Sequence, residues 1–192
     1  MAHKNIILIG DPRLKKVNKV VTDFTSSPFK NLIQDLKDTM KHEDLIGLAA
    51  PQIAKNVQVF VTHPRNTKAR NIGKADVFRV YVNPKITFTS KNDVIIYEGC
   101  GCVPNIFGPV DRPVEIKIEA QDEKGQLFSL YCDGILSRVV QHEYDHMSGI
   151  EFIEKIADYK KIVSREYYIK TIKNSKEQLK ASQITKIILS KK

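Results

Sequence analysis

The feature that most constrains this chain is a pair of histidines four residues apart, His142 and His146, with Glu143 directly after the first. Residues at this spacing lie on one face of a helix, so the two imidazoles can bind one metal ion from the same side. A carboxylate at position 143 can take a proton from water at that ion. The motif therefore predicts a helix that carries two metal ligands and a general base, as in a metal-dependent hydrolase.

The residues around the motif predict that this helix is buried. It follows Asp133, a good N-cap residue, and it ends before Gly149, which can adopt the left-handed conformation of a helix C-terminus. Its broad apolar surface consists of Ile135, Leu136, Val139, Val140 and Met147. Two histidines on such a helix are either metal ligands or hydrogen-bonded core residues, and the motif favours the metal site. A third ligand has to come from a distant segment.

Length and composition indicate one globular domain. The chain has 192 residues, of which 42% are hydrophobic and 28% are charged. No apolar run approaches the roughly 18 residues of a membrane span, and residues 6–9 are too few for a secretory signal. We therefore expect a cytoplasmic protein that does not enter a membrane. Three cysteines cannot form a disulfide framework, and Cys132 is expected to be a small buried side chain.

Hydrophobic periodicity predicts a block of strands with helices on either side. Ser27 and Pro28 precede apolar residues at helical spacing, which predicts a helix to about residue 42. A final long helix is expected over residues 158–180, followed by a partly ordered amphipathic tail through Lys192. The expected strands are residues 57–61, 78–82, 86–89, 94–97, 114–120 and 127–132. This order is typical of an α+β fold with antiparallel sheets rather than of alternating βαβ units.

Three stretches, in this order, resemble the peptide deformylase family. They are residues 47–52 (Gly-Leu-Ala-Ala-Pro-Gln), residues 98–100 (Glu-Gly-Cys) and residues 141–146 (Gln-His-Glu-Tyr-Asp-His). The resemblance extends over roughly residues 6–156, and three motifs in order are far more specific than the histidine pair alone. A zinc peptidase would share that pair, but it usually takes its third ligand from a downstream His or Glu.

The resemblance implies a fold, a metal site and a reaction. The implied fold has antiparallel β-sheets packed around a central helix that carries the two histidines, with a further helix at the C-terminus. The implied metal ligands are Cys100, His142 and His146, which would bind Fe²⁺ in the cell, although Zn²⁺ and Ni²⁺ also suit them. The implied reaction removes the formyl group from the N-terminal formylmethionine of newly made polypeptides and releases formate.

The resemblance also implies roles for individual residues. Glu143 would be the general base, while the side-chain amide of Gln52 and the backbone N–H of Gly101 would stabilise the oxyanion. Arg112 would pair with Glu98 in a structural role. The loop at residues 46–47 would pair with the substrate backbone as an added strand. The residues implied to bind the substrate are Ile46, Gly47 and Gly99.

Three positions depart from the family pattern. Leu45 stands where the family usually has a glycine, which predicts a narrower peptide groove. Gly101 replaces the usual Leu or Ile after Cys100, and it keeps the backbone N–H but loses a side chain. Cys102 adds a second thiol near the metal ligands. This thiol supports one alternative, a non-catalytic deformylase-like protein with a closed Cys₂His₂ structural metal site.

Positive charge is concentrated near the C-terminus. The net charge is +9, and residues 151–192 contain 11 Lys and Arg against 5 Asp and Glu. We expect a catalytic domain over residues 1–156 and a basic C-terminal helix and tail over residues 157–192, packed on that domain or extending from it. This segment either keeps the protein soluble or contacts an anionic partner, for which the ribosome is the natural candidate.

Overall fold

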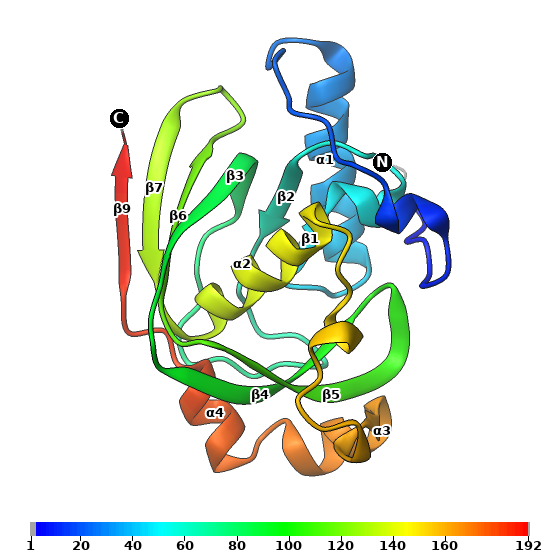
Figure 1. The fold of residues 1–192 in the computed structure, drawn as a ribbon, viewed down its shortest axis with the longest axis vertical. Helices are drawn as coiled ribbons and strands as arrows, with labels where there is room; N and C mark the ends of the chain where they lie inside the picture. Colours follow the sequence, from blue (N-terminus) through cyan, green and yellow to red (C-terminus); the bar gives the residue numbers. More distant parts are fainter. Residues whose placement is uncertain (1–2, 192) are drawn as a thin grey trace.

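The computed structural model describes residues 3–191 and shows an α+β fold in which one helix lies between two antiparallel sheets (Figure 1). The six-stranded sheet has the order β1-β2-β3-β6-β7-β9, and the three-stranded sheet has the order β4-β5-β8. The strands are β1 (Gly47–Ala49), β2 (Val59–Thr62), β3 (Arg79–Thr89), β4 (Asp93–Cys100), β5 (Val103–Pro113), β6 (Ile116–Gln121), β7 (Leu127–Cys132), β8 (Val163–Ser164) and β9 (Ile187–Lys191).

The helical segments include the central helix that the sequence predicted. The α-helices are α1 (Ser27–His42), α2 (Gly134–Met147), α3 (Arg165–Tyr167) and α4 (Lys176–Ser182). Short helical turns connect these elements: η1 (Pro12–Lys15), η2 (Ala50–Ile53), η3 (Phe152–Lys155), η4 (Tyr159–Lys161) and η5 (Tyr168–Ile172). The predicted α+β class, the central helix α2 with the histidine motif, and a C-terminal helix, α4, are confirmed.

Strand β2 and residues 80–82 of β3 are buried on both faces, which explains their continuous apolar sequence. Phe60 and Tyr81 stack with ring centroids 4.5 Å apart and belong to the core beneath α2. Val59 and Val61 of β2, together with Val80 and Val82 of β3, belong to a second core beneath α1. Because successive side chains of a strand point to opposite faces, these strands lie between two helices.

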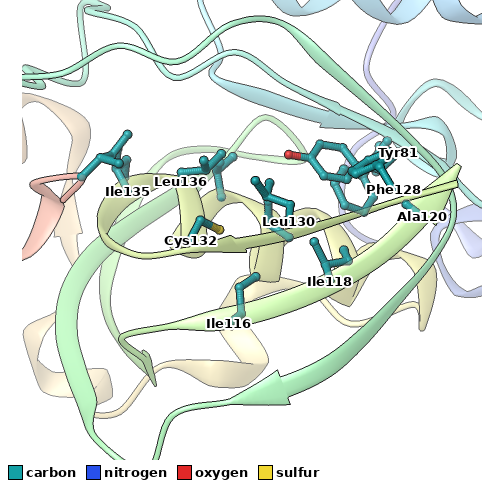
Figure 2. Packing of buried hydrophobic residues seen from close by; sticks show 14 of the residues in the cluster. Tyr81, Ile116, Ile118, Ala120, Phe128, Leu130, Cys132, Ile135 and Leu136 are labelled. Atoms are coloured by element: carbon teal, nitrogen blue, oxygen red, sulfur yellow. The ribbon is translucent and has the colours of Figure 1, made fainter. Parts of the chain in front are cut away.

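The core beneath α2 joins the apolar face of this helix to strands β6 and β7. Figure 2 shows Ile135 and Leu136 of α2 beside Leu130 and Cys132 of β7. Cys132 is fully buried in this cluster as a free thiol, so its predicted role as a small core side chain is confirmed. This packing fixes the apolar face of α2 and leaves its other side for β4 and β5.

The predicted helices α1 and α2 both form, but their N-caps differ from the prediction: Ser26, rather than the expected Ser27, is the N-cap residue of α1, and Asp133 does not cap α2 with its side chain. α1 covers Ser27–His42 with Pro28 in its first turn. Asp133 is the N-cap residue of α2, but its carboxylate binds the C-terminal segment, where it accepts hydrogen bonds from the backbone N–H groups of Thr185 and Lys186. The start of the central helix is therefore tied to the end of the chain.

Strand β5 was not predicted. It contains Pro104, Pro109, Pro113 and Gly108, residue types that are rare inside strands, so its local sequence indicates a loop. Pairing with β4 overrides that preference. The strands expected at residues 78–82 and 86–89 form one strand, β3, with a register shift after Val82.

The expected long helix over residues 158–180 is wrong. The segment breaks because Val163–Ser164 pairs with β5 as strand β8, and because two serines start new helical segments. Ser164 Oγ accepts from the N–H of Tyr167, and Ser175 Oγ accepts from the N–H of Gln178. The tail is also more ordered than expected, since Ile187–Lys191 pairs with β7 as β9; Lys192 lies outside the described residues.

None of the helices within residues 3–191 combines the length and the apolar character needed to cross a membrane.

Candidate active site

Three side chains that can bind a metal meet between β4 and α2. Cys100 ends β4, and His142 and His146 lie one turn apart on α2. Their ligand atoms all lie within 4.8 Å of one another, and Cys100 Sγ is 3.4 Å from His146 Nε2. The centroids of the two imidazole rings are 5.3 Å apart. The structure thus brings together the three residues that the sequence analysis named as ligands.

The surroundings prepare these side chains for a cation. Burial, with the nearby His142 and Arg112, lowers the pKa of His146 well below its ordinary value, so its imidazole is neutral. His142 Nδ1 donates to Glu98 Oε2 (2.9 Å), which leaves Nε2 free to bind. The hydrogen bond with the Cys102 thiol and burial raise the pKa of the Cys100 thiol well above its ordinary value. The charge of a bound cation would act in the opposite direction and favour the thiolate.

Glu98 organises the buried charges behind the ligands. Besides His142, its carboxylate accepts hydrogen bonds from Arg112 Nε (2.7 Å) and Arg138 Nη1 (3.0 Å). Arg112 also pairs with Asp145 (2.7 Å). Burial opposes ionisation of Glu98, but Arg112 and the other donors outweigh it and hold the pKa of Glu98 well below its usual value. The expected pairing of Arg112 with Glu98 is confirmed.

Glu143 presents a carboxylate that is not fully satisfied by protein groups. The residue is 3% exposed, and its Oε2 has no hydrogen-bond partner among residues 3–191. Burial, with negative charge at Cys102 and Glu98, raises the pKa of Glu143 well above its ordinary value. An unpaired buried carboxylate is unfavourable, so this oxygen is expected to face water or a ligand. The site therefore contains a candidate proton acceptor.

The side-chain amide of Gln52 points towards the ligand Cys100. The N–H of Ala49 donates to Gln52 Oε1 (2.7 Å), which orients the side chain. Its Nε2 then lies 3.4 Å from the sulfur of Cys100 and 3.5 Å from the sulfur of Cys102. Because the amide is almost completely buried, the orientation of this donor is set before any ligand arrives.

A cavity of about 270 Å³ opens onto these groups. The predicted site residues that line it are Ile46, Gly47, Gln52, Gly99, Cys100, Gly101, His142 and Glu143. A Cβ at Gly47 would lie 2.5 Å from Glu143 Oε1, and a Cβ at Gly99 would lie 2.8 Å from the ring of Phe107. Glycine at these two positions lets the backbone lie closely against the side chains of Glu143 and Phe107, which line the cavity. His146 is buried and is not part of this lining.

Comparison with known proteins agrees with this geometry. The family model described as polypeptide deformylase matches residues 3–162. Peptide deformylase 2 of Clostridium perfringens is 38% identical over 165 residues, which cover 86% of this chain and 100% of that protein. This chain belongs to the polypeptide deformylase family.

Solved deformylase structures share the fold. The peptide deformylase from Thermotoga maritima superposes with a TM-score of 0.73 and 32% identity, covering 82% of this chain and all of that chain. The class I type b peptide deformylase from Acinetobacter baumannii, solved with Met-Ala-Ser bound, gives a TM-score of 0.74 and 28% identity, covering 81% and 99% of the two chains. The fold is therefore the one that these deformylases share.

The donor set fits the metal of a deformylase. One thiol and two imidazoles lie together, and the unpaired carboxylate oxygen belongs to Glu143, the residue next to His142, which matches a site with three protein ligands and an open position. Within residues 3–191 this ligand group includes Cys100 and leaves out Cys102. Cys102 is instead fully buried, and its sulfur accepts from Gln52. The closed Cys₂His₂ alternative is therefore not supported.

Two departures from the deformylase pattern are neighbours in space. A Cβ at Gly101 would lie 2.9 Å from Ile6 Cδ1 and 3.4 Å from Leu45 Cδ1. The side chains of Ile6 and Leu45 thus occupy the space beside Gly101, and Leu45 lines the cavity. The narrower peptide groove expected from Leu45 stays a prediction.

Some residues around this deformylase site were missed by sequence analysis. Arg138 precedes His142 by four residues and so shares its helix face, a spacing that could have revealed it. Arg70 and Arg165 also line the cavity, but they come from a loop and from the C-terminal segment. No local pattern connects those two segments to the site.

Proposed function

We propose that this chain removes the formyl group from the N-terminal formylmethionine of newly made polypeptides and releases formate. The observation that carries this proposal is the unpaired carboxylate oxygen of Glu143 together with the ligand group of Cys100, His142 and His146, because Glu143, Cys100 and His142 line the same cavity. A site with a proton acceptor, a set of metal ligands and a groove for a chain end suits hydrolysis of a terminal amide.

Cys100, His142 and His146 would hold one divalent cation, which we propose to be Fe²⁺, with Zn²⁺ and Ni²⁺ as alternatives that suit the same ligands. When bound, the ion would activate water and polarise the formyl oxygen as a Lewis acid. Glu98 positions the His142 ring through the hydrogen bond to Nδ1.

The residues of the chain divide the remaining chemistry between proton transfer and charge stabilisation. Glu143 accepts the proton of the water that adds to the formyl carbon, and it delivers this proton to the departing amine nitrogen as the C–N bond breaks. Its raised pKa suits a group that must both take and return a proton. Gln52 Nε2 and the N–H of Gly101 donate to the oxygen on which negative charge develops.

Peptide binding is proposed for the edge of the six-stranded sheet. Strand β1 is the outermost strand of that sheet, and Gly47 lines the cavity, so a peptide can add to this edge as another strand. Ile46, Gly47 and Gly99 would contact the substrate backbone. The bound Met-Ala-Ser of the Acinetobacter deformylase supports a peptide that begins with methionine.

The deciding experiment is release of formate from formyl-Met-Ala-Ser by protein purified anaerobically with Fe²⁺. We expect turnover with this peptide and none with acetyl-Met-Ala-Ser, because the extra methyl group enlarges the acyl group at the metal site. Removal of the ion by a chelator should abolish turnover, and adding Fe²⁺ back should restore it. A metal-loaded protein that releases no formate would contradict the proposal.

Gln52→Leu is expected to lower kcat by roughly a hundredfold with little change in KM, the usual effect of losing one oxyanion donor. The reason is that the Gln52 amide lies beside the proposed metal ligand Cys100, close to where the formyl oxygen would acquire negative charge, rather than in the outer groove. Steady-state kinetics on formyl-Met-Ala-Ser measures both constants, and Gln126→Leu in an exposed turn is the matched control. A change confined to KM would assign Gln52 to ground-state binding.

We further propose that the enzyme acts in the cytoplasm on chains that leave the ribosome, with residues 157–192 packed on the catalytic domain of residues 1–156. Contact between the basic segment and ribosomal RNA is part of this proposal. Its exposed lysines include Lys160, Lys161, Lys170, Lys176 and Lys180. These side chains lie on several short elements, so they offer scattered charges rather than one helix face.

Replacing these five lysines by glutamine is expected to weaken co-sedimentation with ribosomes, while the wild-type binding should fall steeply as salt is raised. Charge replacement is the suitable change because truncation would remove β8 and β9 from the two sheets. The matched control replaces exposed lysines elsewhere: Lys30, Lys41, Lys55, Lys85 and Lys91. Equal loss in both variants would show a non-specific charge effect and would argue against this contact.

A further inference from the structure

The C-terminal segment forms part of the wall of the substrate cavity. Strand β8 pairs with β5 at Ile106 and Phe107, two residues that line the cavity. Arg165 follows β8 directly and lines the same cavity. It lies just beyond residues 3–162, the part that the family model matches.

Arg165 stands on a rigid support. Three residues after it, Tyr168 is fully buried and stacks on Phe107 with ring centroids 4.1 Å apart and planes 6° apart. Gln178 links this ring to β4, because its side chain bonds the backbone of Tyr97 and the hydroxyl of Tyr168. These contacts fix the backbone from which Arg165 extends, so the guanidinium is held at the cavity wall while its side chain can still adjust to a ligand.

A second arginine stands beside the same support. Arg70 lies over the Tyr168 ring at 5.6 Å, donates to the Tyr168 hydroxyl (3.0 Å) and donates to the carbonyl of Tyr97 (2.7 Å). None of these partners carries a negative charge. Arg70 therefore adds a fixed positive charge to the wall that Arg165 also lines.

The charge of Arg165 is not neutralised by the protein. Its side chain is partly buried, and its guanidinium makes no hydrogen bond or ion pair with any residue in the described range 3–191. The carboxylates of the cavity are engaged elsewhere or serve the reaction. Asp44 lies near Arg65, Glu43 contacts His42, and Glu98 pairs with Arg112. This part of the wall thus carries unpaired positive charge.

We propose that Arg165, assisted by Arg70, selects formylated peptides with a carboxylate side chain on one of the three residues that follow the methionine. The inference rests on the proposed function, because it assigns a substrate preference to that same cavity. A guanidinium suits this task, since its planar donors match a carboxylate with two parallel hydrogen bonds. Charge complementarity would also raise the rate of association with acidic chain ends.

The test compares pairs of peptides that differ only in charge. The parent is formyl-Met-Ala-Ser-Ala amide, whose blocked C-terminus carries no carboxylate, with Glu or Gln placed at the second, third or fourth position. For one position at least, we expect kcat/KM of the Glu peptide to exceed that of the Gln peptide about five- to tenfold at low salt, the scale of a partly exposed charge pair. This ratio should shrink towards one in about 0.5 M salt.

Variants of the C-terminal segment assign the preference. In Arg165→Gln the ratio is expected to fall to within about twofold of one, and Arg165→Lys should retain part of it. Lys170→Gln removes an exposed charge from the same segment and should keep the wild-type ratio. Because each ratio is measured within one protein, a general loss of folded enzyme cannot imitate the result. Equal rates at all three positions in the wild type, or a ratio that survives in Arg165→Gln, would overturn the inference.

Measurements of peptide binding test the charge preference independently of the proposed reaction. Calorimetry with the unformylated Met-Glu and Met-Gln peptides of the same series measures the charge preference without turnover. Tighter binding of the Glu peptide that is lost in Arg165→Gln supports the inference even if formate is never released. Formate release without any Glu preference in rate or affinity refutes the inference alone and leaves the reaction standing.

Discussion

Glu143→Gln is expected to lower kcat on formyl-Met-Ala-Ser by at least about a hundredfold, the usual scale of general acid–base catalysis, while the protein still binds its metal. The amide has nearly the same shape as the carboxylate but cannot accept a proton from water. Glu143 lies outside the candidate ligand group, so metal content should not change. Turnover and metal analysis on the same preparation measure both quantities.

The stability of this variant gives an independent check. The Oε2 atom of Glu143 is buried and has no partner in the described structure, so replacing the carboxylate by a neutral amide should leave the free energy of unfolding equal or higher. Glu123→Gln in the exposed hairpin turn is the matched control, with wild-type activity expected. Activity of Glu143→Gln within a few-fold of wild type, at unchanged metal content, would exclude Glu143 as the base.

Glu98→Gln is expected to reduce the free energy of unfolding by about 3–5 kcal/mol, because it leaves the buried guanidinium of Arg138 without its carboxylate and Arg112 with only Asp145. The same change removes the carboxylate that orients His142. Metal affinity is therefore expected to fall about 10- to 100-fold, as for other lost partners of ligating histidines. Denaturant unfolding of the metal-free protein and competition with a chelator measure the two effects separately.

An exposed ion pair serves as the control for the stability effect of Glu98→Gln. Asp35 pairs with Lys4 at 3.5 Å, and the two side chains are 25% and 45% exposed. Asp35→Asn should change the free energy of unfolding by less than about 1 kcal/mol, because solvent screens exposed pairs. If Glu98→Gln proved as mild as Asp35→Asn, the buried cluster would not stabilise the fold, and its role would be limited to the metal site.

The sequence predicted the residues at the centre of the site, but not all of the residues that surround them. The motif around His142 and the short stretches that contain Gln52 and Cys100 pointed to residues that the structure does bring together. It did not reveal that Arg138 shares the carboxylate of Glu98 with Arg112. That contact depends on where the start of α2 lies against β4 and β5, which neither segment encodes alone.

The same distinction holds for the fold. The strand at Leu127–Cys132 was predicted with correct bounds because its sequence, its turn and its burial all agree. Strand β5 was missed because its prolines and glycine indicate a loop, and only pairing with β4 makes it a strand. The C-terminal region was assigned to one helix because its apolar spacing is helical, while the pairing of β8 and the two serine caps break it.

By itself, the sequence determined the family and the chemical groups of the reaction, because motif order and helical spacing are properties of neighbouring residues. His142 and His146 lie on one face of α2, with Glu143 next to the first, for the reason that any residues at this spacing do. Only the tertiary structure decided that Arg165 stands in the wall of the cavity. Its position follows from the pairing of β8 with β5 and the stacking of Tyr168 on Phe107, contacts between segments far apart in the chain that no local pattern specifies.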